Sequence, residues 1–158
     1  MSDANERLWA PWRLEYIKNP DKSQGDFIAE CDAAAPEADR KNLVITRSQL
    51  SICMLNRYPY NNGHLLVAPR RAVADFSGLT DDELLDCQKL LRQMVDVSKK
   101  VLNFDGCNIG LNLGRAAGAG LPQHLHWHIV PRWNGDTNYM TLTAGTRVIV
   151  ASLDEMWL

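Results

Sequence analysis

The chain has 158 residues, of which 46% are hydrophobic, and its formal net charge at pH 7 is −2. This length allows one domain with a sizeable core, and the near-neutral charge, with Lys and Arg scattered, gives no basis for nucleic-acid or membrane-surface binding. The apolar runs are far shorter than the roughly 20 residues of a membrane helix, and the polar N-terminus is unlike a signal peptide. We therefore expect a cytoplasmic protein.

The N-terminal part is expected to be an arm and loop (1–41) ahead of the core (42–158) of a single domain. Residues 8–16 (LWAPWRLEY) contain two tryptophans and a tyrosine, a cluster expected to pack on the domain or on a second subunit. Residues 18–41 are rich in Asp, Lys, Ala, Gly and Pro, which predicts a loop with room for one short helical turn.

Three strands are expected next. Apolar runs at 43–46 (LVIT) and 51–55 (SICML) predict a hairpin. The segment YPYNNG at 58–63 is a strong turn signal, and it leads into a short strand over 64–69 that ends at a proline.

One long helix is predicted from Thr80 to about Leu102. Thr80 and Glu83 have the spacing of a capping box, in which each side chain satisfies the other residue's backbone N–H. Apolar residues then recur at helical spacing, which predicts a core-facing stripe. The stripe consists of Leu84, Cys87, Leu91, Met94, Val95 and Val101.

The C-terminal third returns to strands. An alternating strand is predicted over 107–114, followed by the small-residue loop RAAGAG at 115–120, and residues 146–157 predict a final helix. The chain ends there without a helix stop signal, which leaves a longer natural C-terminus open. The order of strands, one long helix and strands predicts an α+β fold with a mainly antiparallel sheet.

Four cysteines stand at positions 31, 53, 87 and 107, and none share a CxxC or CxC spacing, so no local metal site is expected from them. Cys53, Cys87 and Cys107 lie among apolar residues, which predicts reduced and buried side chains. Cys31 lies in a polar stretch and is interpreted as a free thiol.

The most informative segment is the run QHLHWHIVPR at 123–132, which holds all the histidines of the chain except His64. Because strand side chains alternate between two faces, a strand here would place three histidines on one face and apolar residues on the other. The histidines are His124, His126 and His128, and the apolar residues are Leu125, Trp127 and Ile129. Grouped imidazoles can act as base, nucleophile or metal ligand near neutral pH.

Two chemistries compete for this histidine face. Imidazoles two residues apart on a strand can share a metal ion, but no carboxylate lies between 116 and 134 to serve as a further ligand or partner. The loop at 114–120 leads directly into the histidines, and its small residues would let backbone N–H groups approach an anion. A neutral imidazole is also a competent nucleophile toward a phosphate ester, so the pattern favours phosphorus chemistry.

The run HLHWHIV fits the pattern His-x-His-x-His with apolar residues between, and the chain resembles the histidine triad (HIT) family. The segments LWAPWRLEYI, LNRYPYNNGHLLVAPRR, GLNLG and HIVPRWNGDTNY are similar to the bacterial branch that includes diadenosine tetraphosphate (Ap4A) phosphorylases and related hydrolases. These segments extend the resemblance over most of residues 8–140.

The resemblance implies an α+β domain that forms a homodimer across a continuous sheet. It implies an enzyme that transfers or hydrolyses a nucleotidyl group of a nucleoside polyphosphate, with Ap4A phosphorolysis included. In this scheme His126 attacks the α-phosphate and forms a covalent nucleotidyl-histidine, and His128 contacts the phosphate and leaving group. His124 would lie behind His126 and set its tautomer by hydrogen bonding.

The resemblance also implies a nucleotide-binding site. Its residues would be Asn112 on the α-phosphate, Asn56 on the ribose, Met54 and Leu66 as walls of the base pocket, and Gly118, Ala119 and Gly120 around the phosphates.

Two departures from the family pattern matter. Ile28 and Cys31 stand where many bacterial members carry CxxC, and the segment RRAV at 70–73 lacks a further histidine, so we expect no structural zinc and no metal site. No cofactor is expected to be required, although a divalent metal ion can accompany the nucleotide. Gly120 stands where family hydrolases often have Gln or Ser, which leaves the acceptor and the substrate's chain length open.

Other functions stay open from sequence alone. The same residues could hydrolyse adenosine phosphoramidates or other AMP conjugates. A non-catalytic nucleotide-binding protein and a histidine metalloprotein are alternatives of other classes. The roles of His64 and Arg115 are also left open.

Overall fold

The structure is a computed structural model that describes residues 25–136 and 156–157. The aromatic cluster at 8–16 lies outside the described residues. Of the helix predicted at 146–157, only residues 156 and 157 are described, and both are helical.

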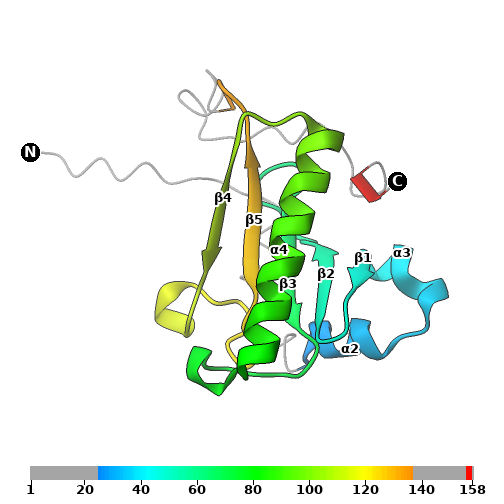
Figure 1. Ribbon diagram of the computed structural model, residues 1–158, viewed down its shortest axis with the longest axis vertical. Helices are drawn as coiled ribbons and strands as arrows, with labels where there is room; N and C mark the ends of the chain where they lie inside the picture. Colours follow the sequence, from blue (N-terminus) through cyan, green and yellow to red (C-terminus); the bar gives the residue numbers. More distant parts are fainter. Residues whose placement is uncertain (1–24, 137–155, 158) are drawn as a thin grey trace, which may run out of the picture.

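Five strands form one antiparallel sheet in the order β1-β2-β3-β5-β4, and the long helix α4 lies across one face (Figure 1). The strands are β1 (Val44–Arg47), β2 (Ser51–Leu55), β3 (Leu65–Pro69), β4 (Gly106–Leu111) and β5 (Trp127–Arg132). The helices are α2 (Phe27–Ala33), α3 (Asp39–Asn42) and α4 (Asp81–Leu102), with short 3-10 turns at Pro36–Ala38, Phe76–Gly78 and Arg115–Ala117. The predicted α+β class, hairpin, third strand and long helix are confirmed.

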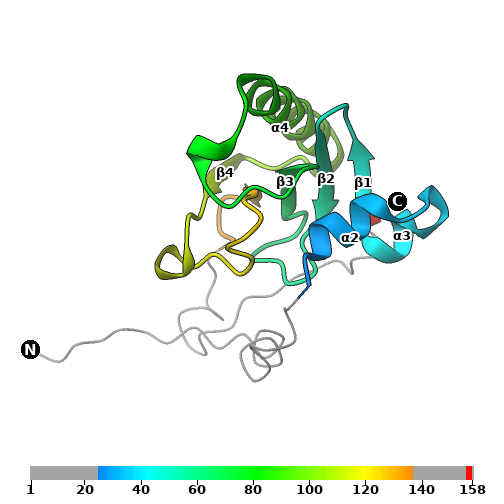
Figure 2. The same cartoon turned by 90° about the horizontal axis from the view of Figure 1, so that it is seen from below.

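Strands β2 and β3 are buried on both faces because each face of the sheet carries an apolar set. One set packs under α4, and the other packs under α2, which lies with α3 away from α4 (Figure 2). The α4 side includes Cys53, Leu55, Leu65, Val67, Leu125, Trp127 and Ile129, and the α2 side includes Ile28, Val44, Ile52, Met54, Leu66, Ala68 and Leu121. The predicted apolar partners of the histidine run therefore do face the core.

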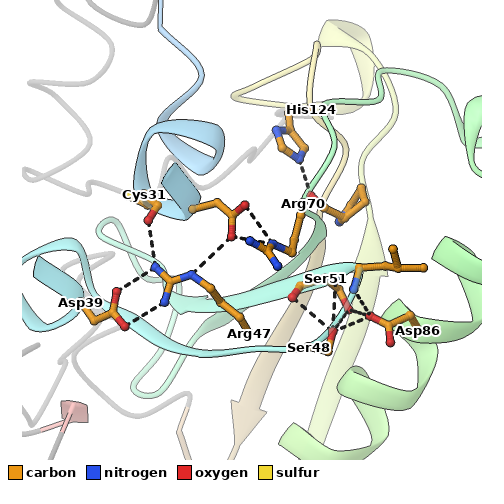
Figure 3. A network of polar contacts seen from close by, with 11 residues as sticks. Cys31, Asp39, Arg47, Ser48, Ser51, Arg70, Asp86 and His124 are labelled. Carbon is orange, nitrogen blue, oxygen red and sulfur yellow. Dashed lines mark hydrogen bonds and ion pairs between the residues drawn. The ribbon is translucent and has the colours of Figure 1, made fainter. Parts of the chain in front are cut away.

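Helix α4 begins as predicted and is tied to the sheet by polar contacts. Thr80 and Glu83 form the capping box in both directions. Asp86, one turn further along, accepts hydrogen bonds from the hydroxyls of Ser48 and Ser51 at the β1–β2 turn (Figure 3). Carboxylate–hydroxyl bonds of this kind fix the helix relative to the hairpin.

The prediction of a loop over 18–41 is wrong for residues 25–41, because the structure has the helices α2 and α3 there. Asp26 caps a helix, because its side chain accepts from the N–H of Ala29, and Ile28 is completely buried against the sheet. The cap and the buried side chain of Ile28 stabilise this helix, although the segment is rich in Asp and Ala and has little apolar periodicity. α3 then ends at Leu43, which adopts the left-handed conformation with φ 63°.

The single strand predicted through all three histidines is also wrong, because β5 begins only at Trp127. The ladder with β3 ends at the pair Val67 and Trp127. Before it, the N–H of Leu125 donates to the carbonyl of Val73, at 2.8 Å, instead of to a neighbouring strand. His124 and His126 therefore lie in the segment that leads into the strand.

Two smaller expectations also change. β4 ends at Leu111 rather than reaching Gly114, where a φ of 75° turns the chain into the following loop. Cys53 and Cys87 are buried as predicted, whereas Cys107 is only half-buried like Cys31, and all four thiols are free. No helix within the described ranges is both long and apolar enough to cross a membrane.

The capping box makes a testable contribution to stability. Replacing Thr80 with Ala removes the hydroxyl that accepts from the N–H of Glu83, so we expect the free energy of unfolding to fall by about 1 kcal/mol in urea titrations. Ser77→Ala, which removes a nearby exposed hydroxyl, is the control and should change stability by much less. Equal stability of the Thr80→Ala variant and the wild type would contradict the structural role of the cap.

Candidate active site

His126 presents an unprotonated nitrogen directly before β5. The residue is buried, with 7% of its surface exposed, and its Nδ1 lies 2.9 Å from the backbone carbonyl of His124. A carbonyl oxygen can only accept, so Nδ1 must carry the proton and Nε2 is left with a lone pair. Burial lowers the pKa of His126 below its ordinary value of 6.5, which keeps the ring neutral near pH 7. The result is an imidazole with the properties of a nucleophile.

A chain of hydrogen bonds gives His128 the opposite tautomer, with its proton on Nε2. The N–H of Tyr60 donates to Nδ1 of His64 at 3.0 Å, so the proton of His64 is on Nε2. That nitrogen lies 2.9 Å from Nδ1 of His128, to which it therefore donates. His128 must then carry its own proton on Nε2, where it can be donated to a ligand.

The Nε2 atom of His128 is buried and has no hydrogen-bond partner among the described residues. Burial, with a smaller contribution from His126, lowers the pKa of His128 to about 4, so the ring is neutral. Its ring centroid lies 5.0 Å from that of His126. A nucleophilic nitrogen and an unpartnered N–H donor thus lie side by side, an arrangement suited to a phosphate ester.

His124 contributes to this site differently from the expectation. Its backbone carbonyl, rather than its ring, makes the hydrogen bond that sets the tautomer of His126. The ring is completely buried elsewhere, between the carboxylate of Asp26 and the carbonyl of Pro69, each at 2.7 Å.

The apolar residues assigned to the base pocket form a row with His128. Met54 on β2 pairs with Leu66 on β3, and Leu66 pairs with His128 on β5. Because directly paired residues of an antiparallel sheet share a face, all three lie on the face opposite α4. Both apolar side chains are buried, at 3% exposure each.

The two asparagines each lie just after a strand, Asn56 after β2 and Asn112 after β4. Asn56 follows β2, where its Oδ1 accepts from the N–H of Tyr58 at 2.9 Å and its Nδ2 lies 3.3 Å from Nδ1 of His64. Its amide therefore supports the turn and the histidine relay, while contact with a ribose stays a prediction. Asn112 is half-buried directly after β4, and its contact with phosphate also stays a prediction.

The loop at 114–120 is closed in part by its own backbone hydrogen bonds. The N–H groups of Ala117, Gly118 and Ala119 donate to the carbonyls of Gly114 and Arg115 within the loop itself. Contact of Gly118, Ala119 and Gly120 with the phosphates stays a prediction. Gly120 is exposed at the end of this loop.

Sequence reasoning missed two contributors to the site. His64 was left without a role, although its position after a strong turn signal and before a strand was a usable clue. Asp26 lies 98 residues before His124, and no pattern in the sequence connects them. Within the described ranges, no three His, Cys, Asp or Glu side chains form a group that could hold a metal ion.

Comparisons with known proteins identify the family of this chain. The HIT domain model matches residues 37–135. The chain belongs to the HIT family. It is 40% identical over 152 residues to "AP-4-A phosphorylase" of Mycobacterium tuberculosis, covering 93% of this chain and 78% of that protein. It is also 40% identical over 93 residues to the asymmetrical bis(5'-nucleosyl)-tetraphosphatase of Schizosaccharomyces pombe, covering 59% and 50% of the two chains.

Solved structures share the fold. A Zn-bound histidine triad family protein from Mycobacterium smegmatis aligns with a TM-score of 0.62 at 24% identity, covering 82% of this chain and 84% of that one. The family and the fold expected from sequence are thereby confirmed.

The lowered pKa of His128 predicts a pH-dependent stability. Between pH 6.5 and about 4, the unfolded chain binds a proton at this histidine and the folded chain does not, so acid favours unfolding. Relative to His128→Asn, the wild type should lose up to about 3 kcal/mol of unfolding free energy over this range. Urea titrations of both proteins at several pH values measure the difference in their free energies of unfolding. Groups that titrate alike in the two proteins do not contribute to this difference. A pH-independent difference would contradict the buried neutral state of His128.

Proposed function

We propose that this protein is an HIT-family nucleotidyl transferase that acts on Ap4A or a related nucleoside polyphosphate, with His126 as the nucleophile. The observation that carries the proposal is the lone pair on Nε2 of His126 beside the unpartnered N–H of His128. Relatives named for Ap4A phosphorolysis and tetraphosphate hydrolysis support the substrate class.

In the first step, Nε2 of His126 attacks the α-phosphorus of Ap4A. A nitrogen–phosphorus bond forms, the bond from phosphorus to the bridging oxygen breaks, and ATP leaves. The imidazole becomes positively charged, and its Nδ1–H bond to the carbonyl of His124 strengthens, because a charged donor makes a stronger hydrogen bond. The Nε2–H of His128 stabilises the charge that develops on the phosphate or leaving oxygen.

In the second step, an acceptor attacks the phosphorus of the nucleotidyl-histidine, and the lone pair returns to Nε2 of His126. The position of the proton on the neutral His128 ring favours inorganic phosphate as this acceptor. Nε2 of His128 already carries a proton, so it cannot remove one from an attacking water, whereas phosphate brings an anionic oxygen that needs no base. The products would be ADP and ATP, and we propose that no cofactor is required.

Product analysis tests this function. Ap4A is incubated with the wild type and with His126→Ala, with and without inorganic phosphate, and with a chelator in a parallel series. We expect ADP and ATP in the presence of phosphate, and a rate at least about 10³-fold lower for His126→Ala because the covalent step is lost. Nucleotide affinity should be retained by the variant.

Other outcomes identify the alternatives. AMP and ATP formed without phosphate would make the protein a hydrolase and overturn the choice of acceptor. Turnover of adenosine phosphoramidates but not of Ap4A would keep the mechanism and replace the substrate. Binding without any turnover would indicate a nucleotide-binding protein, and loss of activity with chelator would favour the metal alternative.

We also propose that the enzyme works in the cytoplasm as a homodimer. Four free thiols suit a reducing compartment.

β4 stands at the edge of the sheet with Ile109 52% exposed, and Leu113 just after it is 45% exposed. An edge strand with exposed apolar side chains is suited to pairing with a second copy.

The dimer is tested by placing a charge on this edge. Ile109→Glu introduces a carboxylate at an exposed position, so the fold should persist while association weakens by about tenfold or more. Light scattering over a concentration series measures the mass, and Val101→Glu, an exposed position on α4, is the control. A wild type that is monomeric at all concentrations would contradict the proposal.

A further inference from the structure

The ring of His124 is held between two groups that can only accept hydrogen bonds. Its Nδ1 lies 2.7 Å from the Oδ2 of Asp26, and its Nε2 lies 2.7 Å from the carbonyl oxygen of Pro69. A neutral imidazole has one N–H and could satisfy only one of them. Both contacts are made together only by the imidazolium form, whose charge is balanced by the carboxylate of Asp26.

The same carboxylate also begins helix α2. Oδ1 of Asp26 accepts from the N–H of Ala29 at 3.0 Å, as an N-cap residue does. One oxygen is therefore used by the helix and the other by the histidine. The carboxylate cannot rotate freely, so the direction of its contact with His124 is determined by where α2 lies.

α2 is in turn fastened to the sheet by a network of charged groups (Figure 3). Arg47 on β1 donates to the carbonyl of Cys31 at 3.0 Å and pairs with Asp32 at 3.3 Å. Arg70, directly after β3, donates to both oxygens of Asp32. Together with the buried side chain of Ile28, these contacts fix the helix that carries Asp26.

We propose that Asp26 is a positioning residue for the reaction at His126, an inference that rests on the proposed function. Its carboxylate holds the His124 ring against Pro69, and the held ring fixes the peptide of His124. The carbonyl of that peptide accepts the Nδ1–H of His126 at 2.9 Å and so keeps the lone pair on Nε2. Asp26 acts through His124 and not on the substrate.

Asp26→Ser separates this role from helix capping. Ser caps a helix about as well as Asp, so α2 should remain, but its short side chain does not reach the ring, and the buried imidazolium loses its counter-charge and gives up a proton. One of the two contacts of the ring then breaks, and the peptide of His124 is no longer fixed. We expect kcat to fall about 10- to 100-fold with KM for the nucleotide unchanged within about twofold. Asp26→Asn should restore much of the lost kcat, because its Oδ1 keeps the cap and its amide N–H can donate to Nδ1 of a neutral His124, whose Nε2–H still donates to Pro69.

Nitrogen-15 NMR of the histidine side chains gives a readout that needs no substrate. In the wild type at pH 7, both nitrogens of His124 should have protonated shifts, and His126 should be a single tautomer with the proton on Nδ1. In Asp26→Ser, one nitrogen of His124 should move to an unprotonated shift, and His126 should become a mixture of tautomers. This measurement decides the link from Asp26 to His126 even if Ap4A is the wrong substrate.

The matched control is Asp39→Asn. It removes a carboxylate that pairs with Arg47 at 2.8 Å on the same side of the sheet, and it leaves the Asp26–His124 contact intact. Its melting temperature should fall, while kcat and both histidine signals stay as in the wild type. The inference is overturned if Asp26→Ser keeps a wild-type kcat or a single His126 tautomer. An equal loss of kcat in Asp39→Asn would make the effect merely structural and would also overturn it.

Discussion

The chemistry of this protein depends on one hydrogen bond, from Nδ1 of His126 to the carbonyl of His124. An imidazole in water exchanges its proton between two nitrogens, and only one of the two tautomers presents Nε2 as a lone pair. A buried carbonyl removes this choice because it can only accept. The rest of the fold serves to hold that carbonyl in place and to put a donor of the opposite polarity next to the resulting nucleophile.

Burial of the central strands β2 and β3 on both faces makes such control possible. Trp127 and Ile129 of β5 pack under α4, so the intervening His128 is turned to the opposite face. There its Nδ1 meets His64, directly before β3, whose own tautomer is set by a backbone N–H. Each ring thus takes its polarity from a backbone group, directly or through one neighbour, and backbone groups do not titrate. Burial then keeps the rings of His126 and His128 neutral, because the charged form is poorly solvated there.

The features that depend on residues close together in the chain could be predicted from the sequence. The capping box at Thr80 and the alternation of apolar residues around the histidines depend on neighbours a few positions away. The helix at Phe27–Ala33 was missed because it is held by one buried residue, Ile28, and one cap, and shows no apolar periodicity along the sequence. The start of β5 was missed because Pro69 directs its carbonyl to a histidine ring, a contact between residues 55 positions apart. The Asp26–His124 ion pair is longer-range still and has no local signature.

The charge of that ion pair explains why a carboxylate is useful so close to a site for anions. A lone buried imidazolium at His124 would hold its ring firmly, but its charge lowers the pKa of His126, as burial already does to a greater extent. A lone carboxylate at Asp26 would act in the opposite sense and promote protonation of the nucleophile. Paired, the two charges largely offset one another at His126 while both hydrogen bonds of the His124 ring are kept. The pair therefore supplies a fixed geometry with little net charge, so His126, the proposed nucleophile, can stay neutral while the phosphates of the proposed substrate approach it.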